Sequence, residues 1–432
     1  MDTIFALGTG AGRAAIAVIR LSGPAVANVL MELTGALPAA RLAGLVTLRD
    51  PATGEALDQG LALFFPGPKS ATGEDYAELQ IHGGQAVVTG VLRALSNCPG
   101  LRPAEPGEFA RRGFANGRLD LSQAEALADL IDAQTEAQRR QALRIAGGAL
   151  RRQVESWRET LIEALARVEA ELDFSDEADV DAFDRRGLRA LIDPLCGEMR
   201  AALQNAPASE RMREGFMVMI MGPPNAGKST LLNALARRDL AIVSPRPGTT
   251  RDMIEAHLDL GGLPATFVDT AGLREAADEI ERIGVDRVLA RVESADLALW
   301  LSAGGEAPPV GIPDGIEVLK VSTKCDLVAA PEGWIAVCAE TAEGLDLLLE
   351  WISRQAKARL GDGASALLIR ERHRTAVVSA LSALEQALAG EKDLEFIAED
   401  LRSATRALGR IVGAVDVEHV LDAVFSRFCI GK

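Results

Sequence analysis

The chain has 432 residues, of which 48% are hydrophobic, and its formal net charge at pH 7 is −16. A chain of this length is expected to hold about two or three domains, and its apolar fraction excludes an intrinsically disordered protein. The acidic balance excludes nucleic-acid binding through overall charge, so contact with RNA phosphates needs a local basic patch or a partner. No stretch approaches the ~18–20 uninterrupted apolar residues of a membrane helix, so we expect no membrane partner.

The cysteines are scattered along the chain and never form a CxxC pair. They are Cys98, Cys196, Cys325, Cys338 and Cys429. An odd number of dispersed cysteines is typical of a reducing compartment and offers no thiolate cluster for zinc. The first residues carry no basic segment before the apolar ones, so we expect no signal peptide and a cytoplasmic location.

Residues 1–118 are rich in Gly and Pro and contain short apolar runs, for example at 15–19 and 61–65. Such runs between turn residues predict short strands with helices between them. We therefore expect an α+β domain over residues 1–118.

From residue 119 onward the pattern is helical. Ser122 and Glu125 have the spacing of a capping box, which predicts the start of a helix. Apolar residues at steps of three and four from 150 to 172 predict a long amphipathic helix. The acidic stretch 173–184 lacks the spacing of a calcium loop and is expected to be a solvated loop.

Helical periodicity returns after about residue 352. Its last apolar stripe consists of Val417, Val420, Leu421, Val424, Phe425 and Phe428. Because the helical stretches on both sides of residues 214–351 are long and one-sided, we expect them to pack on each other, which makes the central region an insertion. The expected domains are thus 1–118, a helical domain formed by 119–213 and 352–432, and an inserted domain over 214–351.

The inserted region opens with a phosphate-binding pattern. Residues 216–221 are all apolar and predict a buried strand, which leads into Gly-Pro-Pro-Asn-Ala-Gly-Lys-Ser at 222–229 and then a helical segment. In this strand–loop–helix setting, loop amides and the helix N-terminus surround phosphates. Lys228 would reach the β and γ groups, and the Ser229 hydroxyl would bind Mg²⁺.

Three later motifs favour GTP over ATP. Thr250 lies in a Gly-Thr-Thr-Arg-Asp segment and can complete the Mg²⁺ shell, as a switch loop does. Asp269 follows an apolar strand, where it would serve Mg²⁺, and the Gly272 amide can contact the γ-phosphate. Asp326, after a strand at 316–321, can accept both N–H groups of the guanine edge. The order of these motifs predicts a Ras-like P-loop GTPase domain.

The water-orienting and charge-stabilising groups of other GTPases are missing. Leu273 stands where Ras-like proteins carry the glutamine that orients the attacking water, and no arginine finger is evident. Asn225 could instead help to hold an extra cation beside the phosphates, which would do the same electrostatic work.

Several motifs outside the nucleotide-binding region are more specific. They are Asp2-Thr3-Ile4 with 19–23, Thr72-Gly73-Glu74-Asp75 with 78–80 and 82–84, Pro106-Gly107-Glu108-Phe109, 119–121 with 123–126, and Phe428-Cys429-Ile430-Gly431-Lys432. With them the chain resembles the MnmE (TrmE) family of bacterial tRNA modification GTPases over essentially its whole length.

The resemblance implies a multidomain protein with an N-terminal folate-binding and dimerising domain, a helical domain and an inserted GTPase domain. It implies a homodimer that works with an FAD-containing partner, MnmG, in a heterotetramer. The two would add carboxymethylaminomethyl- or aminomethyl-type groups at C5 of the wobble uridine of certain tRNAs. The one-carbon donor would be 5-formyl- or 5,10-methylene-tetrahydrofolate. Potassium would drive contact between the two GTPase domains and activate hydrolysis.

The resemblance also assigns residues. Those implied to bind GTP are Asn225, Ala226, Gly227, Lys228, Ser229, Thr230, Ser244, Pro245, Arg246, Pro247, Gly248, Thr249, Thr250, Asp269, Thr270, Ala271, Gly272, Thr323, Lys324, Cys325, Asp326, Cys338, Ala339 and Glu340. Those implied to surround K⁺ are Asn225, Ser244, Arg246 and Thr249, while Ser229 and Thr250 bind Mg²⁺. Glu281 would bridge to the attacking water. The folate contacts would be Arg20, Glu78, Arg118 and Lys432.

The chain departs from the family pattern at several of these positions. Thr323 replaces the usual Asn of the guanine motif, Cys338 replaces a Ser, and Arg118 replaces a Lys. Residues 8–13 replace a proline-containing turn. Cys429 is either a nucleophile whose pKa the neighbouring Lys432 lowers, or a small residue that packs the C-terminal stripe.

Two other functions are compatible with the same motifs. One is a GTP-dependent ribosome-assembly switch, although the chain shows no appended basic RNA-binding domain. The other is a stand-alone folate enzyme with a regulatory GTPase domain.

Overall fold

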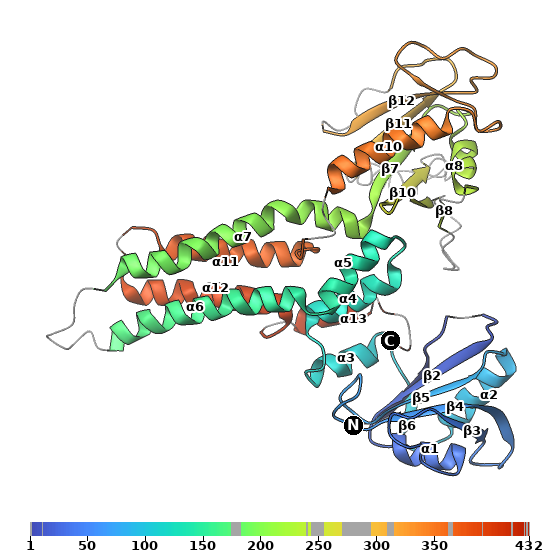
Figure 1. Cartoon of the computed structure of the whole chain (residues 1–432), viewed down its shortest axis with the longest axis vertical. Helices are drawn as coiled ribbons and strands as arrows, with labels where there is room; N and C mark the ends of the chain where they lie inside the picture. Colours follow the sequence, from blue (N-terminus) through green and yellow to red (C-terminus); the bar gives the residue numbers. More distant parts are fainter. Residues whose placement is uncertain are drawn as a thin grey trace, which may run out of the picture. The chain divides into compact units, whose positions relative to one another are not determined.

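The computed structural model describes residues 2–10, 12–173, 183–238, 241–242, 255–269, 295–308, 315–361, 366–390, 392–415, 418–426, 428 and 431. The chain forms two compact units (Figure 1). The first contains residues 1–128, 146–159 and 405–432, and the second contains residues 129–145 and 160–404. In the described part of the chain, no helix has the length and apolar character needed to cross a membrane.

The first unit is built on a six-stranded sheet with the order β3-β4-β5-β2-β1-β6. Its strands are β1 (Thr3–Leu7), β2 (Ile16–Ser22), β3 (Gly44–Arg49), β4 (Ala56–Phe65), β5 (Tyr76–His82) and β6 (Leu101–Pro103). All neighbours are antiparallel except β1 and β6, which are parallel. The strands predicted at 15–19 and 61–65 are therefore confirmed as parts of β2 and β4.

One face of this sheet packs on the larger apolar core of the unit, and the other carries polar side chains beside a smaller apolar cluster. Ile19 and Leu79 face the core formed with α1 (Val26–Thr34) and α2 (Gln85–Ser96). Because successive side chains of a strand point to opposite faces, Arg20 and its cross-strand neighbour Glu78 lie on the other face.

Besides α1 and α2, the first unit contains α3 (Glu108–Ala115), most of α4 (Leu121–Asp132) and α13 (Glu418–Phe425). Phe425 and Phe428 pack against Ala110 and Ala124, with Leu421 at the edge of the cluster. The predicted apolar stripe is thus confirmed as a packing surface for Leu421, Val424, Phe425 and Phe428, while Val417 lies outside the described residues.

The capping box predicted at Ser122 and Glu125 is wrong. The carboxylate of Asp120 accepts a hydrogen bond from the Gln123 amide nitrogen at 2.9 Å, and the Gln123 side chain accepts one from the Asp120 amide at 3.1 Å. The reciprocal pair is therefore two residues earlier, and α4 begins at Leu121. The Ser122 hydroxyl adds a bond to Asp120 at 2.6 Å.

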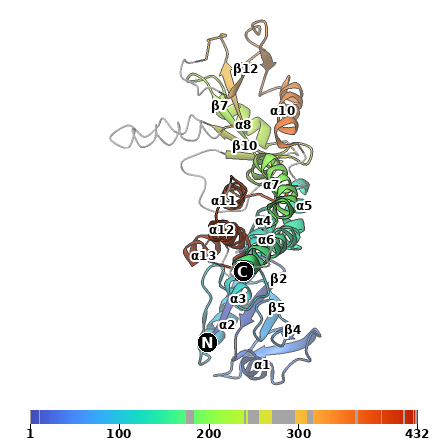
Figure 2. The ribbon, with the colours of Figure 1, turned by 90° about the vertical axis from the view of Figure 1, so that its left-hand side faces the viewer.

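Long helices form much of the second unit. They are α5 (Glu136–Ala146), the later part of α6 (Ala149–Asp173), α7 (Arg185–Glu214), α10 (Leu345–Leu360), α11 (Glu371–Ala387) and the first part of α12 (Leu394–Val412). α11 lies beside α7 (Figures 1 and 2), and Arg200 on α7 pairs with Glu385 on α11 at 2.7 Å. The predicted amphipathic helix is confirmed as α6, and the predicted packing of flanking helices is confirmed for α7 and α11. The acidic stretch lies mostly outside the described residues.

The second unit also holds a seven-stranded sheet with the order β13-β12-β11-β7-β10-β9-β8. Its strands are β7 (Phe216–Met221), β8 (Ala241–Ile242), β9 (Glu255–Asp259), β10 (Pro264–Asp269), β11 (Leu297–Ser302), β12 (Glu317–Thr323) and β13 (Ile335–Val337). The strands from β13 to β10 are parallel, whereas β9 is antiparallel to β10 and β8 to β9.

The strand order reverses beside β7. After β7 the chain adds β10 on one side and then β11, β12 and β13 on the other. In open α/β sheets, ligands bind at the carboxyl ends of the strands near such a reversal. Leucines of α8 (Lys228–Ala236) and α10 complete the core of this layer. The predicted multidomain fold class, with an α+β sheet domain, helices and a Ras-like parallel sheet, is confirmed.

Candidate functional site

The phosphate loop follows the carboxyl end of β7 without a break. Gly222, Asn225 and Gly227 have positive φ angles of 152°, 63° and 85°. A Cβ atom on Gly222 would lie 2.3 Å from the carbonyl oxygen of Leu301, so only glycine fits there. α8 begins directly after the loop at Lys228, so its first amides lie at the place where the sequence predicted phosphate binding.

Lys228 and Ser229 lie on the first turn of α8. The Lys228 ammonium donates to the carbonyl oxygens of Gly222 at 3.0 Å and Pro223 at 2.9 Å, which orients it over the loop. The Ser229 hydroxyl donates to the Asp269 carboxylate at 2.6 Å. A hydroxyl and a carboxylate in contact at a phosphate site are oxygen ligands that Mg²⁺ accepts, so these residues fit the predicted metal.

The predicted guanine motif is tied to the phosphate loop. Thr323 ends β12, is 6% exposed, and its hydroxyl donates to the carbonyl oxygen of Ala226 at 2.8 Å. The hydroxyl that replaces the family's Asn amide therefore supports the phosphate loop directly.

The two loops expected to hold the base are neighbours. The Cys325 amide donates to the carbonyl oxygen of Val337 at 3.4 Å, and the Cys338 amide donates to that of Glu343 at 2.9 Å. Desolvation raises the pKa of the Cys325 thiol, and the nearby Glu343 carboxylate raises it further. This thiol is therefore neutral near pH 7.

Part of the predicted site lies outside the described residues. The predicted GTP-site residues among them are Ser244, Pro245, Arg246, Pro247, Gly248, Thr249, Thr250, Thr270, Ala271 and Gly272. Glu281, Cys429 and Lys432 also lie outside. The predicted residues that the structure brings together at the sheet edge are 225–230, Asp269 and 323–326.

A second polar site lies on the face of the N-terminal sheet opposite α1 and α2. Arg20 and Glu78 are direct partners in the β2–β5 register, with 3.4 Å between Arg20 Nε and Glu78 Oε1. The Arg20 side chain also donates to the carbonyl oxygen of Gly431 at 3.1 Å. Residues separated by 411 positions, both from motifs noted in the sequence, are thus in contact.

Tyr76 is a residue of this site that the sequence analysis missed. Its hydroxyl donates to Glu78 Oε1 at 3.0 Å, and burial raises its pKa well above the usual value, so it is a donor at neutral pH. Its position two residues before Glu78 on a strand was the available signal, because such residues share a face. The remaining predicted folate contact in the described chain, Arg118, donates from Nε to the carbonyl oxygen of Ser70 at 3.1 Å.

A cluster of charged side chains lies in the same unit. Arg112 on α3 donates to Asp2, Glu74 and Glu108, with bonds of 2.8, 3.0 and 3.0 Å to their carboxylates. Arg102 donates to both oxygens of Glu108, at 2.5 and 2.8 Å. Burial alone would raise the pKa of Glu108, but the hydrogen bonds from Arg102 and Arg112 hold it below the ordinary value.

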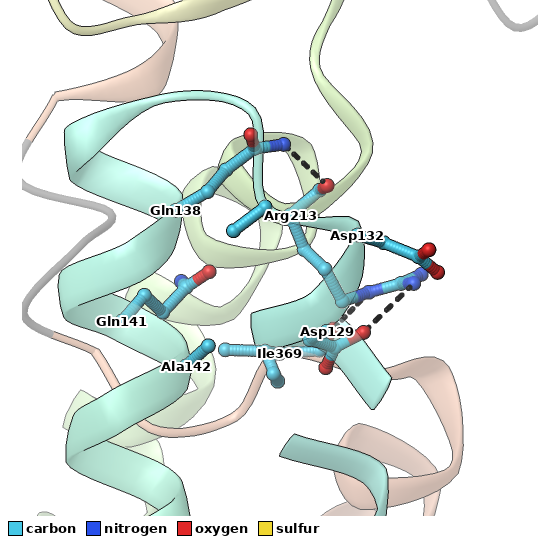
Figure 3. Close-up of a pocket in the computed structure, with 8 residues that line it drawn as sticks. Asp129, Asp132, Gln138, Gln141, Ala142, Arg213 and Ile369 are labelled. Atoms are coloured by element: carbon cyan, nitrogen blue, oxygen red, sulfur yellow. Dashed lines mark hydrogen bonds and ion pairs between the residues drawn. The ribbon is translucent and has the colours of Figure 1, made fainter. Parts of the chain in front are cut away.

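The second unit contains a polar pocket of about 170 Å³ where the chain enters and leaves the nucleotide-binding region (Figure 3). Arg213, just before β7, donates from Nε to the carbonyl oxygen of Ile369 at 3.1 Å. The Gln138 side chain donates to the Arg213 carbonyl oxygen at 3.0 Å. Asp129 of α4 accepts from Arg370 at 2.7 Å and lies 3.9 Å from Arg213 Nη1. Both connecting segments are thus held together at α4 and α5.

Comparison with known proteins decides the family. The model described as the GTP-binding protein TrmE N-terminus matches residues 3–118, and the model of the MnmE helical domain matches residues 121–429. The chain belongs to the MnmE (TrmE) family.

Relatives in the MnmE family are similar over the whole chain. The tRNA modification GTPase MnmE of Azorhizobium caulinodans is 53% identical, and the match covers 100% of this chain and 99% of that protein. The MnmE proteins of Methylobacterium sp. (strain 4-46) and Methylorubrum populi are each 55% identical, over 100% of this chain and 100% and 98% of theirs. Membership confirms the predicted enzyme class, a GTPase of tRNA modification.

Solved structures that this MnmE-family chain matches include one of much lower identity. The G domain of the T. maritima FeoB iron transporter is 23% identical, over 32% of this chain and 98% of that one, with a TM-score of 0.25. A likeness of this size supports no argument about function.

Proposed function

We propose that the chain hydrolyses GTP to drive modification at C5 of the wobble uridine of certain tRNAs, together with an FAD-containing MnmG partner. The observation that carries the proposal is the phosphate loop, with Ser229 bonded to Asp269 and Thr323 bonded to Ala226. The full-length relatives are named tRNA modification GTPases, which favours this function over a ribosome-assembly switch.

Different residues of the site are proposed to bind the phosphates, the guanine and the metal ion. The amides of 225–229 and the Lys228 ammonium hold the phosphates, and Asp326 accepts the N–H groups of guanine. Ser229 and Asp269, with Thr250, would hold Mg²⁺, which neutralises charge that develops on the phosphates when bound. Because Lys228 is already oriented by two carbonyl oxygens, little reorganisation is needed when a phosphate arrives.

Potassium is proposed to replace the arginine finger. Asn225, Ser244, Arg246 and Thr249 would supply oxygen ligands, and Glu281 would orient water in the absence of a glutamine at Leu273. Hydrolysis of GTP is expected to be several-fold faster in K⁺ than in Na⁺, because Na⁺ is too small for loop oxygens that are spaced for K⁺. Equal rates in the two salts at matched ionic strength would overturn this mechanism.

The N-terminal site is proposed to bind a tetrahydrofolate, either the 5-formyl or the 5,10-methylene form. Arg20 and Lys432 suit the glutamate carboxylates of the ligand, and Glu78 suits the donor edge of the pterin. Arg118 would add a further charge. Bound tetrahydrofolate would supply the one-carbon unit. The contacts of Glu78 with Arg20 and Tyr76 support the proposal, because they fix the position of the carboxylate on this face of the sheet.

We also propose the domain boundaries, the location and the assembly of the protein. The domains are 1–118, 119–213 with 352–432, and 214–351; the protein is a cytoplasmic homodimer and forms a heterotetramer with MnmG. Cys429 serves either as a nucleophile or as a packing residue.

Two measurements test the proposed function in order. Calorimetric titration of the purified chain with 5-formyl-tetrahydrofolate should show binding, and its absence would discard a folate enzyme of any kind. Mass analysis of tRNA nucleosides from a deletion strain should then show loss of the modified wobble uridine. Unchanged nucleosides would leave a stand-alone folate enzyme with a regulatory GTPase domain.

A further inference from the structure

The charged cluster around Arg112 gathers three family motifs to which the nucleotide site gives no role. Asp2 comes from the N-terminal motif, Glu74 from the loop before β5, and Glu108 from the first turn of α3. The two terminal nitrogens of Arg112 donate to all three, including the Asp2 carbonyl oxygen at 2.9 Å. The Arg112 side chain is only 13% exposed. Its position is therefore fixed by these hydrogen bonds, and its positive charge is neutralised by the three carboxylates.

The first path from this cluster leads to Arg20. Glu74 Oε2, which accepts from Arg112, also accepts from the Ser22 hydroxyl at 2.8 Å. Ser22 is fully buried on β2, two residues after Arg20, and therefore on the same sheet face. The hydroxyls of Ser22 and Thr72 lie 2.7 Å apart, so Ser22 is also hydrogen-bonded to the loop that carries Glu74.

The second path leads to Arg118. Within the loop, the Ser70 hydroxyl donates to the Glu74 carbonyl oxygen at 2.5 Å, and the Ser70 carbonyl oxygen accepts from Arg118 Nε at 3.1 Å. The Asn116 side chain donates to the Thr72 carbonyl oxygen at 2.7 Å. The backbone of residues 70–74 therefore fixes the guanidinium of Arg118.

We propose that Arg112 is a positioning residue of the folate site. It holds Glu74, and through Glu74 it sets the places of Arg20 on the strand and Arg118 beside the loop. This inference rests on the proposed folate binding, and it adds that affinity depends on a residue which does not contact the ligand. A guanidinium is required because Nη1 bonds Glu74 while Nη2 bonds Asp2 and Glu108. The three N–H donors of a lysine start from one nitrogen and cannot reproduce these two fixed positions.

The first test compares Arg112→Lys with Arg49→Lys, a control on the exposed β3–β4 hairpin whose side chain donates to Gly54. Both changes keep the net charge. Titration with 5-formyl-tetrahydrofolate is expected to show at least about tenfold weaker binding for Arg112→Lys, because misplaced charged groups lose the geometry of the complex. Arg49→Lys is expected to bind like the unaltered chain. Unchanged affinity of the Arg112→Lys protein would overturn the inference.

A second pair keeps the test decisive if Arg112→Lys does not fold. Thr72→Val preserves shape but removes the hydroxyl that contacts Ser22, while Thr72→Ser retains the hydroxyl. Affinity is expected to fall about three- to tenfold in the valine variant and to return in the serine variant. A purely structural role would lower the unfolding midpoint of Thr72→Val without changing the dissociation constant of the folded protein, and that result would refute positioning.

The unaltered chain separates the two ideas. If it binds no tetrahydrofolate, the proposed function of this site fails and the inference falls with it. If it binds and the Arg112 and Thr72 variants bind equally well, only the inference fails.

Discussion

Replacing Thr323 by valine is the sharpest perturbation of the nucleotide site. The change preserves the shape of the side chain and removes the hydroxyl that donates to the Ala226 carbonyl oxygen at 2.8 Å. Both residues are buried, at 6% and 3% exposed, so water is poorly placed to substitute for the lost donor. Because Ala226 lies in the phosphate loop, the damage should appear as weaker nucleotide binding.

The expected size follows from the hydrogen bond. Depriving a buried carbonyl of a donor costs about 1–2 kcal/mol. At about 1.4 kcal/mol for each factor of ten, this corresponds to roughly 5- to 30-fold weaker binding. GDP and GTP should lose affinity equally, since Thr323 contacts the loop beside Ala226 and Gly227 rather than the residues predicted to sense the γ-phosphate.

The assay is titration of fluorescent GDP and GTP analogues against three proteins. Thr323→Ser keeps the hydroxyl and should bind within about twofold of the unaltered chain. Thr323→Asn restores the residue usual in the family and should bind at least as tightly. If Thr323→Val also binds within that margin, the hydroxyl does not support the phosphate loop and the reasoning is refuted.

Three further changes test other contacts. Tyr76→Phe removes the donor to Glu78 and should weaken tetrahydrofolate binding about two- to tenfold by calorimetry, with GTP hydrolysis unchanged. Glu108→Gln should reduce the decrease in the free energy of unfolding at acid pH, measured by urea unfolding at several pH values. The pKa of Glu108 is below its ordinary 4.5, so its stabilisation is present above that pH and is lost as the pH falls through the folded-state pKa. Asp129→Asn weakens the pair with Arg370 and should lower the free energy of unfolding by about 1–3 kcal/mol, whereas an unchanged urea midpoint would contradict that role.

The nucleotide site could be predicted because its signals are local. The apolar run at 216–221 is β7 with the same limits, and the phosphate loop follows at once. Asp269 and Thr323 each end a strand of one parallel arrangement, so the carboxyl ends of the strands bring them to the same edge. Strand periodicity and motif order were sufficient for this part.

Other features could not be predicted because the deciding contacts are distant or the local signal is ambiguous. Two capping boxes fit the sequence around residue 122, and only the hydrogen bonds of Asp120 with Gln123 select one. The bonds from Arg112 to Asp2 cross 110 positions, and that from Arg20 to Gly431 crosses 411. No periodicity encodes such pairs, and the motifs alone showed only that their members matter.

The bond between Arg213 and Ile369 has a consequence for how the chain can be rearranged. The chain enters and leaves the nucleotide-binding region at neighbouring points. Asp129 of α4 binds Arg370, and Gln138 of α5 binds the Arg213 carbonyl oxygen, so both points are held by these helices. A segment attached in this way is expected to be removable, because a short bridge can rejoin the flanking helices. Because Arg213 and Ile369 are hydrogen-bonded, a displacement of one connecting segment is expected to move the other.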